Sequence, residues 1–179
     1  MLVGDTAVGK SCLIEMYLHN NFSDDYEPTV LDVYKGPKNV DKQMVDLEIH
    51  DTSGDENLGA SRQVVYKEAD LFLLCVAVNQ PKALENIPKW KAELRSVEQE
   101  VPIILVTTKK DLRDVLGKDA SISNEKMKKA KKEFGLMGLH DTSSKVWQDF
   151  NVHKAFNKSI KAALKFKYED DDEDEDDDE

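Results

Sequence analysis

A glycine-rich segment with one lysine, close to the start of the chain, constrains the fold more than any other feature. Residues 4–11 read G-D-T-A-V-G-K-S, a complete match to the pattern G-x-x-x-x-G-K-[ST]. The segment follows a short apolar stretch at residues 1–3 and precedes a helical pattern that includes Leu13 and Tyr17. In this context the backbone N–H groups of the loop point at phosphate oxygens. The sequence therefore predicts a phosphate-binding loop, the alternative being an ordinary glycine turn.

Each residue type in this loop has a physical reason to be there. Lys10 is expected to reach the outer phosphate oxygens, and the Ser11 hydroxyl is expected to join the shell of a Mg²⁺ ion. Gly4 and Gly9 let the backbone approach the phosphates closely. Three further residues complete the expected contacts of the segment: Ala7, Val8 and Cys12. We expect the last of these to be a small buried side chain near the ligand and not a reactive thiol.

Apolar patterns along the chain alternate between strand and helix. Apolar runs at residues 44–49, 71–78 and 103–106 are typical of strands, the last two buried on both faces. Helical spacing follows the phosphate loop and recurs at residues 84–94 and 152–163. The sequence predicts a three-layer α/β fold that binds its ligand at the carboxyl ends of the strands.

The strand before the phosphate loop is short, because only residues 1–3 precede Gly4. Such a strand normally lies in the middle of the sheet and has about five residues or more. We therefore expect an incomplete or mis-started chain, the alternative being a marginally stable domain.

Net charge divides the chain into two parts. All eleven residues from Glu169 to Glu179 are acidic, which leaves 36 − 11 = 25 acidic residues against 25 Lys and Arg in the remainder. A run of like charges repels itself and buries no apolar surface. We expect one domain over residues 1–168 and a disordered acidic tail over residues 169–179.

Four further motifs follow the phosphate loop. They are Y-E-P-T at 26–29, D-T-S-G at 51–54, T-K-K-D at 108–111 and S-S-K at 143–145. With these motifs the chain resembles the Ras superfamily of small GTPases from residue 2 to about residue 165. It is most similar to Rho and Rac proteins, through D-Y-E-P-T-V-L-D-V-Y at 25–34 and P-I-I-L-V-T-T-K at 102–109. The resemblance implies a P-loop fold with a mostly parallel six-stranded sheet.

The resemblance also implies that the ligand is GTP or GDP. Asp111 would accept hydrogen bonds from the guanine ring N1 and the exocyclic amine, which adenine does not offer. Lys109 would lie along the base, Phe22 would pack against it, and Ser143 with the Ser144 N–H would cover the guanine O6. The remaining residues of the implied nucleotide site are Tyr26, Gly54, Thr108 and Lys145. Taken alone, Asp111 has an equally good alternative to the guanine-binding role, which is to cap a helix or loop.

The metal site and the switches follow from the same resemblance. Ser11 and Thr29 would each supply a hydroxyl to Mg²⁺, and Asp51 would hold the ion through water. The segments around Thr29 and Asp51 would be switches I and II, ordered by the γ-phosphate that Lys10 and Thr29 contact. The alternative for Asp51 is a turn residue at the end of a strand.

Asp55 departs from the family pattern at the position of the catalytic glutamine, since D-T-S-G-D stands where the family has D-T-A-G-Q. A glutamine amide both donates and accepts, whereas a carboxylate only accepts and brings negative charge toward the γ-phosphate. We expect catalysis by Asp55 to be impaired. The alternative is that Asp55 acts as a general base.

Thr6 is a second departure, because most family members have glycine there. A branched side chain at this position should obstruct the catalytic glutamine and an inserted arginine finger, which is worth about 10³ to 10⁵ in rate. Ser53 gives D-T-S-G, which resembles the atypical Rnd branch of Rho proteins, whose members stay GTP-bound.

The expected partners follow from the switches and the tail. We expect effector proteins to contact switches I and II, and exchange factors to act on the nucleotide site. Rho proteins end in a basic stretch and a prenylated cysteine, whereas this chain ends in acids, so we expect no lipid anchor. The tail would favour a basic partner, such as the lysines of the last helix, or simply be a solvated segment. We expect a cytoplasmic monomer that binds no nucleic acid.

These features favour a Rho-like GTP-binding switch that uses Mg²⁺ and hydrolyses GTP slowly or not at all. One alternative is a normally cycling Rho-family GTPase. Another is a non-enzymatic interaction module with a degenerate nucleotide site.

Overall fold

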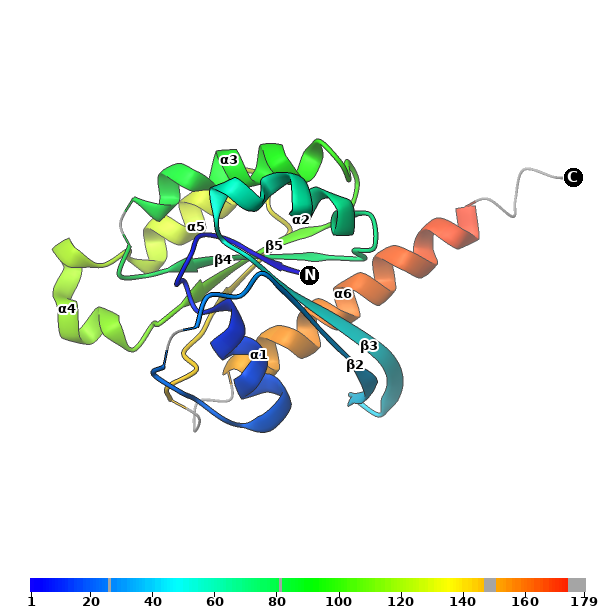
Figure 1. Cartoon of the computed structure of the whole chain (residues 1–179), viewed down its shortest axis with the longest axis horizontal. Coiled ribbons are helices and arrows are strands. Elements are labelled where there is room, and N and C mark those ends of the chain that lie inside the picture. The colour runs from blue at the N-terminus through cyan, green and yellow to red at the C-terminus, as the bar shows by residue number, and fades with distance from the viewer. Residues whose placement is uncertain (26, 81, 147–150, 174–179) are drawn as a thin grey trace, which may run out of the picture.

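The computed structural model describes residues 1–25, 27–80, 82–146 and 151–173. Six strands form one sheet in the order β2-β3-β1-β4-β5-β6, with helices on both faces (Figure 1). The strands are β1 (Leu2–Val3), β2 (Leu31–Val40), β3 (Gln43–Thr52), β4 (Phe72–Ala77), β5 (Ile103–Thr108) and β6 (Gly138–Asp141). Among the described strands, only β2 and β3 pair in the antiparallel sense. The predicted three-layer fold with a mostly parallel sheet is confirmed.

The helices pack in two groups. The helices are α1 (Lys10–His19), the 3-10 helix η1 (Glu56–Leu58), α2 (Gly59–Tyr66), α3 (Ala83–Arg95), α4 (Leu112–Ala120), α5 (Asn124–Glu133) and α6 (Asn151–Glu173). Apolar residues of α1 and α6 form one core with the sheet, and those of α2, α3 and α5 form the other. Tyr17 of α1 stacks on Phe156 of α6 with ring centroids 4.3 Å apart. Both faces of β4 and β5 are therefore covered, which is why these strands are buried throughout and mostly apolar.

The order of the strands positions the site. β1, β3, β4, β5 and β6 run parallel, so their carboxyl ends lie at one edge of the sheet. The phosphate loop follows β1, and the motifs at residues 51–54, 108–111 and 143–145 lie at or just beyond the ends of β3, β5 and β6. All these segments therefore meet at the edge where α/β folds bind ligands.

Strand β2 is an element that the apolar pattern did not predict. β2 lies at the edge of the sheet and is exposed along most of its length, so its residues show no apolar alternation. The turn is made by Asp41 and Lys42, whose φ angles of 49° and 74° suit a tight hairpin. β3 contains the predicted run 44–49 and extends it to Gln43–Thr52.

Helix α6 continues beyond the predicted domain boundary at residue 168. It ends at Glu173, so its backbone includes the first five residues of the acidic run. Extending an established helix adds one hydrogen bond for each residue fixed, which opposes the repulsion between like charges. The rest of the predicted tail, residues 174–179, lies outside the described residues. Within the part of the chain that the structure describes, no helix combines the length and apolar character needed to cross a bilayer.

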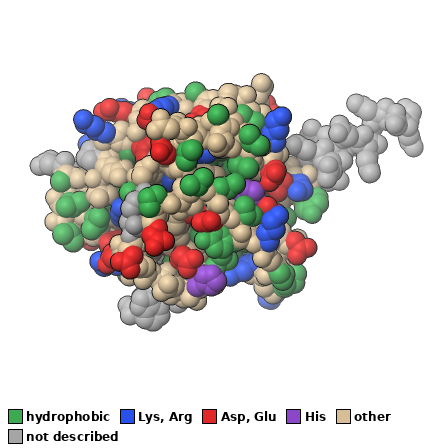
Figure 2. Space-filling view, viewed as in Figure 1, with side chains coloured by type: hydrophobic (Ala, Val, Ile, Leu, Met, Phe, Trp, Pro, Cys, Tyr) green, Lys and Arg blue, Asp and Glu red, His purple; other side chains and the backbone are tan. Residues whose placement is uncertain are grey.

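Charged side chains of both signs are scattered over the face shown in Figure 2, with no large basic area on it. This matches the balance of 25 acidic and 25 basic residues outside the terminal acidic run.

Candidate functional site

The phosphate loop is folded around the side chain of Lys10. The ammonium donates to the carbonyl oxygens of Gly4 and Asp5 over 2.8 and 3.0 Å. Gly4 has a φ of 138°, and a Cβ there would lie 2.3 Å from the carbonyl oxygen of Cys75 in β4. Only glycine therefore fits this position. Burial lowers the pKa of Lys10, an effect opposed by nearby negative groups that include Asp51.

The segment after β5 supports the loop from the other side. The Thr108 hydroxyl donates to the carbonyl oxygen of Val8 over 2.5 Å, and Lys109 Nζ donates to that of Ala7 over 2.8 Å. Two motifs about a hundred residues apart are thus in direct contact. Cys12 lies half-buried in the first turn of α1, and burial raises the pKa of its thiol. A raised pKa leaves less of the thiol as the nucleophilic thiolate at neutral pH.

Asp5 ties the phosphate loop to α3. Its two carboxylate oxygens accept hydrogen bonds from Trp90 Nε1 at 2.7 Å and from Asn86 Nδ2 at 2.8 Å. The sequence analysis gave Asp5 no role. Because the spacing of these α3 residues is helical and the partner is 81 or more positions away, nothing local in the sequence indicates the contact.

The three predicted metal ligands lie together. Ser11 Oγ donates to Asp51 Oδ2 over 2.5 Å and lies 3.1 Å from Thr29 Oγ1. Asp51 is fully buried, and its Oδ1 has no hydrogen-bond partner among the described residues. Burial raises the pKa of Asp51, against the opposing effects of the Ser11 hydrogen bond and the Lys10 charge. Two hydroxyls and one carboxylate suit a hard cation such as Mg²⁺.

The predicted base-binding residues lie together at the ends of β5 and β6. The Ser143 hydroxyl donates to Asp111 Oδ1 over 2.5 Å and accepts from the backbone N–H of Lys145 at 3.2 Å. Ser144 is buried beside it. Lys145 Nζ lies 5.9 Å from the ring centre of Phe22, which brings the segment after α1 to the same place. Tyr26 lies outside the described residues.

The segment after β3 packs on the phosphate loop. A Cβ at Gly54 would lie 2.3 Å from the backbone nitrogen of Thr6 and 2.4 Å from the carbonyl carbon of Asp5, so no larger residue fits without a shift. The next residue, Asp55, is exposed, and its Oδ1 accepts from the backbone N–H and the side-chain amide of Asn57 at 2.9 and 3.0 Å. Asp55 is therefore the N-cap of η1.

Arg62 of α2 fixes this segment to α3. Its guanidinium pairs with both carboxylate oxygens of Glu93 at 3.0 and 3.1 Å. It also donates to the carbonyl oxygens of Ser53 and Asp55, and it lies 4.7 Å from the ring centre of Trp90. The side chain is only 4% exposed. The sequence analysis missed this residue because an arginine in an amphipathic helix is ordinarily solvated.

Comparison with protein-family models gives a match that covers all of these site residues. Residues 1–165 match the model described as Ras family. The matched range begins before the phosphate loop and ends within α6, so it includes every predicted site residue.

Proposed function

Because this chain belongs to the Ras family of small GTPases, we propose that it is a Rho-like GTP/GDP-dependent switch whose GTP hydrolysis is slow or lost. The contact that carries the proposal is the one between Asp55 and Asn57. The side chain at the position of the catalytic glutamine is used as a helix cap and carries the wrong chemistry for orienting water.

Phosphate binding rests on the loop around Lys10. The loop N–H groups and the Lys10 ammonium bind phosphate oxygens, and the buried position of this ammonium strengthens its interaction with negative charge. Ser11, Thr29 and Asp51 would hold a Mg²⁺ ion, which supplies stabilisation of the negative charge that develops on the phosphates. Oδ1 of Asp51, which accepts no hydrogen bond from any residue that the structure describes, supports this role.

Guanine selectivity rests on Asp111. Its carboxylate accepts from the ring N1–H and the exocyclic amine of guanine, and the Ser143 hydroxyl holds the carboxylate in position. Lys109 lies along one side of the base while it donates to Ala7, and Phe22 packs on the other. An adenine ring presents neither donor in this arrangement, so we propose GTP and GDP as the ligands.

Slow hydrolysis has a second cause in Thr6. The backbone of Thr6 touches Gly54, one residue before Asp55, so the Thr6 side chain is carried on the loop that faces the catalytic position. A branched side chain there would obstruct an arginine supplied by a second protein. Since such an arginine contributes about 10³ to 10⁵ in rate, its exclusion would leave little stimulated hydrolysis.

The signalling output would come from switches I and II. Thr29 and Gly54 belong to segments that contact the phosphate loop region, so their order would depend on the γ-phosphate. Exposed apolar side chains flank them, Val30 and Val33 after Thr29 and Val64 in α2, and would contact an effector. Exchange factors would act on the same segments.

The experiment that tests the proposal follows bound nucleotide over time. Purified protein is loaded with GTP and Mg²⁺, freed of excess nucleotide, and analysed by chromatography over several hours, with ATP loading as a parallel test of base selectivity. We expect GTP to be retained without conversion to GDP, and ATP not to be retained. Rapid conversion to GDP would support a normally cycling GTPase instead, and failure to retain any nucleotide would support a non-enzymatic module.

A further inference from the structure

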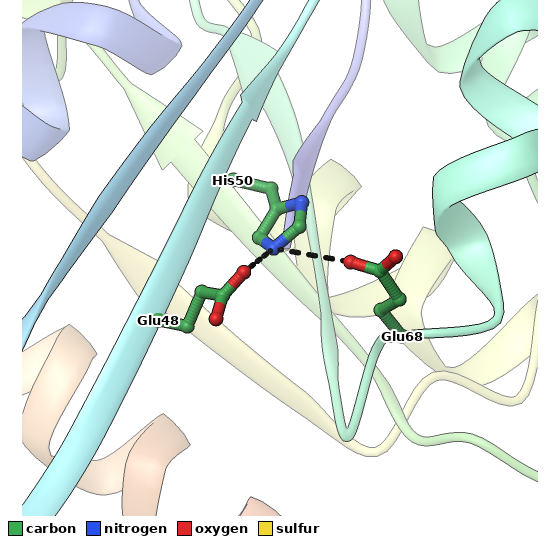
Figure 3. A group of neighbouring side chains, drawn as sticks. All are labelled: Glu48, His50 and Glu68. Carbon is green, nitrogen blue, oxygen red and sulfur yellow. Dashed lines mark hydrogen bonds and ion pairs between the residues drawn. The ribbon is translucent and has the colours of Figure 1, made fainter.

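A histidine and two carboxylates converge beside the carboxyl-terminal half of β3. Glu48 and His50 are two residues apart on β3 and so share a face, and Glu68 lies in the segment after α2 (Figure 3). His50 Nε2 lies 2.7 Å from Glu48 Oε1 and 3.8 Å from Glu68 Oε2. One ligand atom from each residue lies within 4.8 Å of the other two. None of these residues takes part in the nucleotide site described above.

The imidazole of His50 is held so that only Nε2 meets polar groups. The side chain is 7% exposed, and Nδ1 has no hydrogen-bond partner among the described residues. Both carboxylates point at Nε2, as Figure 3 shows. The imidazole nitrogen Nε2 and one carboxylate oxygen each from Glu48 and Glu68 therefore face a common point, and this set of donor atoms suits a metal ion.

We propose that Glu48, His50 and Glu68 bind a Zn²⁺ ion. Imidazole nitrogen and carboxylate oxygen are both zinc ligands, and the nitrogen donor favours zinc over Mg²⁺. With metal-ligand distances of about 2.0–2.2 Å, the ligand atoms of a tetrahedral site are about 3.3 Å apart. The two distances from Nε2 lie on either side of this value, and both carboxylates belong to exposed side chains that can adjust to the ion. Water would take the fourth position.

The ion can reach this position from solvent. The side chains of Glu48 and Glu68 are 39% and 62% exposed, and the cluster lines an open cavity of about 840 Å³ between β3, the segment after α2 and α6. Lys35 is the competing cation, with Nζ 2.8 Å from Glu48 Oε2. It occupies the oxygen that faces away from His50 and leaves Oε1 for the metal. Asp70 and Lys167 line the same cavity as a pair of opposite charge.

Bound zinc would join β3 to the segment that leads from α2 to β4. The helices η1 and α2 separate these two segments along the chain, and a shared ligand set would restrain both. Because an ion that binds only the folded state stabilises it by mass action, zinc would raise the free energy of unfolding.

The test measures zinc binding by the full chain loaded with Mg²⁺ and GDP. Zn²⁺ is titrated calorimetrically, and Co²⁺ is used as a second probe because a tetrahedral site gives it an intense visible absorption. We expect Glu68→Gln to lower the zinc affinity at least tenfold and His50→Gln to abolish the Co²⁺ absorption. Two matched controls, Glu133→Gln on the exposed side of α5 and His140→Gln in β6, should bind like the unmodified chain.

Any zinc binding to the acidic run would be common to all these variants, because it does not depend on His50 or Glu68. Equal zinc affinity in the unmodified chain, Glu68→Gln and His50→Gln would therefore overturn the proposal, as would the absence of binding to the unmodified chain. Because Glu68 is exposed, its substitution leaves the core intact, and unchanged GDP affinity in that variant verifies the fold. The result is independent of whether GTP is hydrolysed.

Discussion

The hydroxyl of Ser11 donates a hydrogen bond of 2.5 Å to Oδ2 of Asp51, a residue 40 positions further along the chain. The bond joins the start of α1 to the end of β3, and Thr29 Oγ1 lies 3.1 Å from the same hydroxyl. Three oxygen-bearing side chains from three segments thus converge beside the loop that surrounds Lys10.

The first prediction concerns the dependence of nucleotide binding on Mg²⁺. Ser11→Ala removes one of the hydroxyls that would hold the ion and leaves the loop backbone unchanged. We expect the gain in GDP affinity on adding Mg²⁺ to fall at least about tenfold, which corresponds to about 1.4 kcal/mol. Titration with a fluorescent GDP analogue, with Mg²⁺ and with a chelator, measures this gain. An identical gain in both proteins would exclude Ser11 from the metal site.

The second prediction concerns base selectivity. Asp111→Asn replaces a carboxylate that accepts twice with an amide that offers one acceptor and one donor. We expect GDP affinity to fall by about 10- to 100-fold, the range for one charge-assisted hydrogen bond. Xanthosine diphosphate, which has a carbonyl in place of the exocyclic amine, should bind the variant better than the unmodified chain. Competition binding with GDP and xanthosine diphosphate measures which nucleotide each protein prefers. An unchanged preference in the variant would contradict the role of Asp111.

The third prediction concerns the pair of Arg62 and Glu93. Removing one partner of a buried ion pair leaves the other unpaired, so Arg62→Ala should lower the free energy of unfolding by about 3–5 kcal/mol. The exposed pair of Lys89 and Glu56 is the matched control, and Lys89→Ala should cost less than about 1 kcal/mol. Urea unfolding of single and double variants gives both coupling energies. Similar energies for the two pairs would contradict a buried anchor at Arg62.

The fourth prediction concerns pH. Burial, and next the charge of Lys158, lower the pKa of His140 below its ordinary value of about 6.5. The folded state therefore favours neutral imidazole, and as pH falls below about 6.5 the unfolded chain binds the proton first. The stability that His140 contributes above this pH is lost as the solution is acidified. His140→Gln should lose less stability than the unmodified chain between pH 7 and pH 5 in urea unfolding; equal losses would contradict the shift.

The site was predictable where backbone geometry demands particular residues. Gly4 must be glycine because a Cβ would overlap the carbonyl oxygen of Cys75, and Lys10 must follow at the spacing that returns its ammonium to the loop. Such requirements leave a local pattern in the sequence. The continuous apolar runs of β4 and β5 were predictable for a similar reason, since both faces of these strands are covered.

Contacts made by ordinary residues between distant elements were not predictable. Arg62 is buried only because Glu93 and Trp90 come to it from α3, and Asp5 has its role only because α3 presents donors to it. The cap formed by Asp55 had a local signal, since aspartate is a preferred N-cap, but this position was interpreted only through its catalytic counterpart.

The most direct test of slow hydrolysis restores the two family residues. Single-turnover GTP hydrolysis is measured for the unmodified chain, Asp55→Gln, Thr6→Gly and the double variant, each loaded with GTP and Mg²⁺. We predict that the unmodified chain retains its GTP for hours and that the double variant converts it to GDP at least ten times faster. Equal rates in the unmodified chain and the double variant would contradict the account of Thr6 and Asp55.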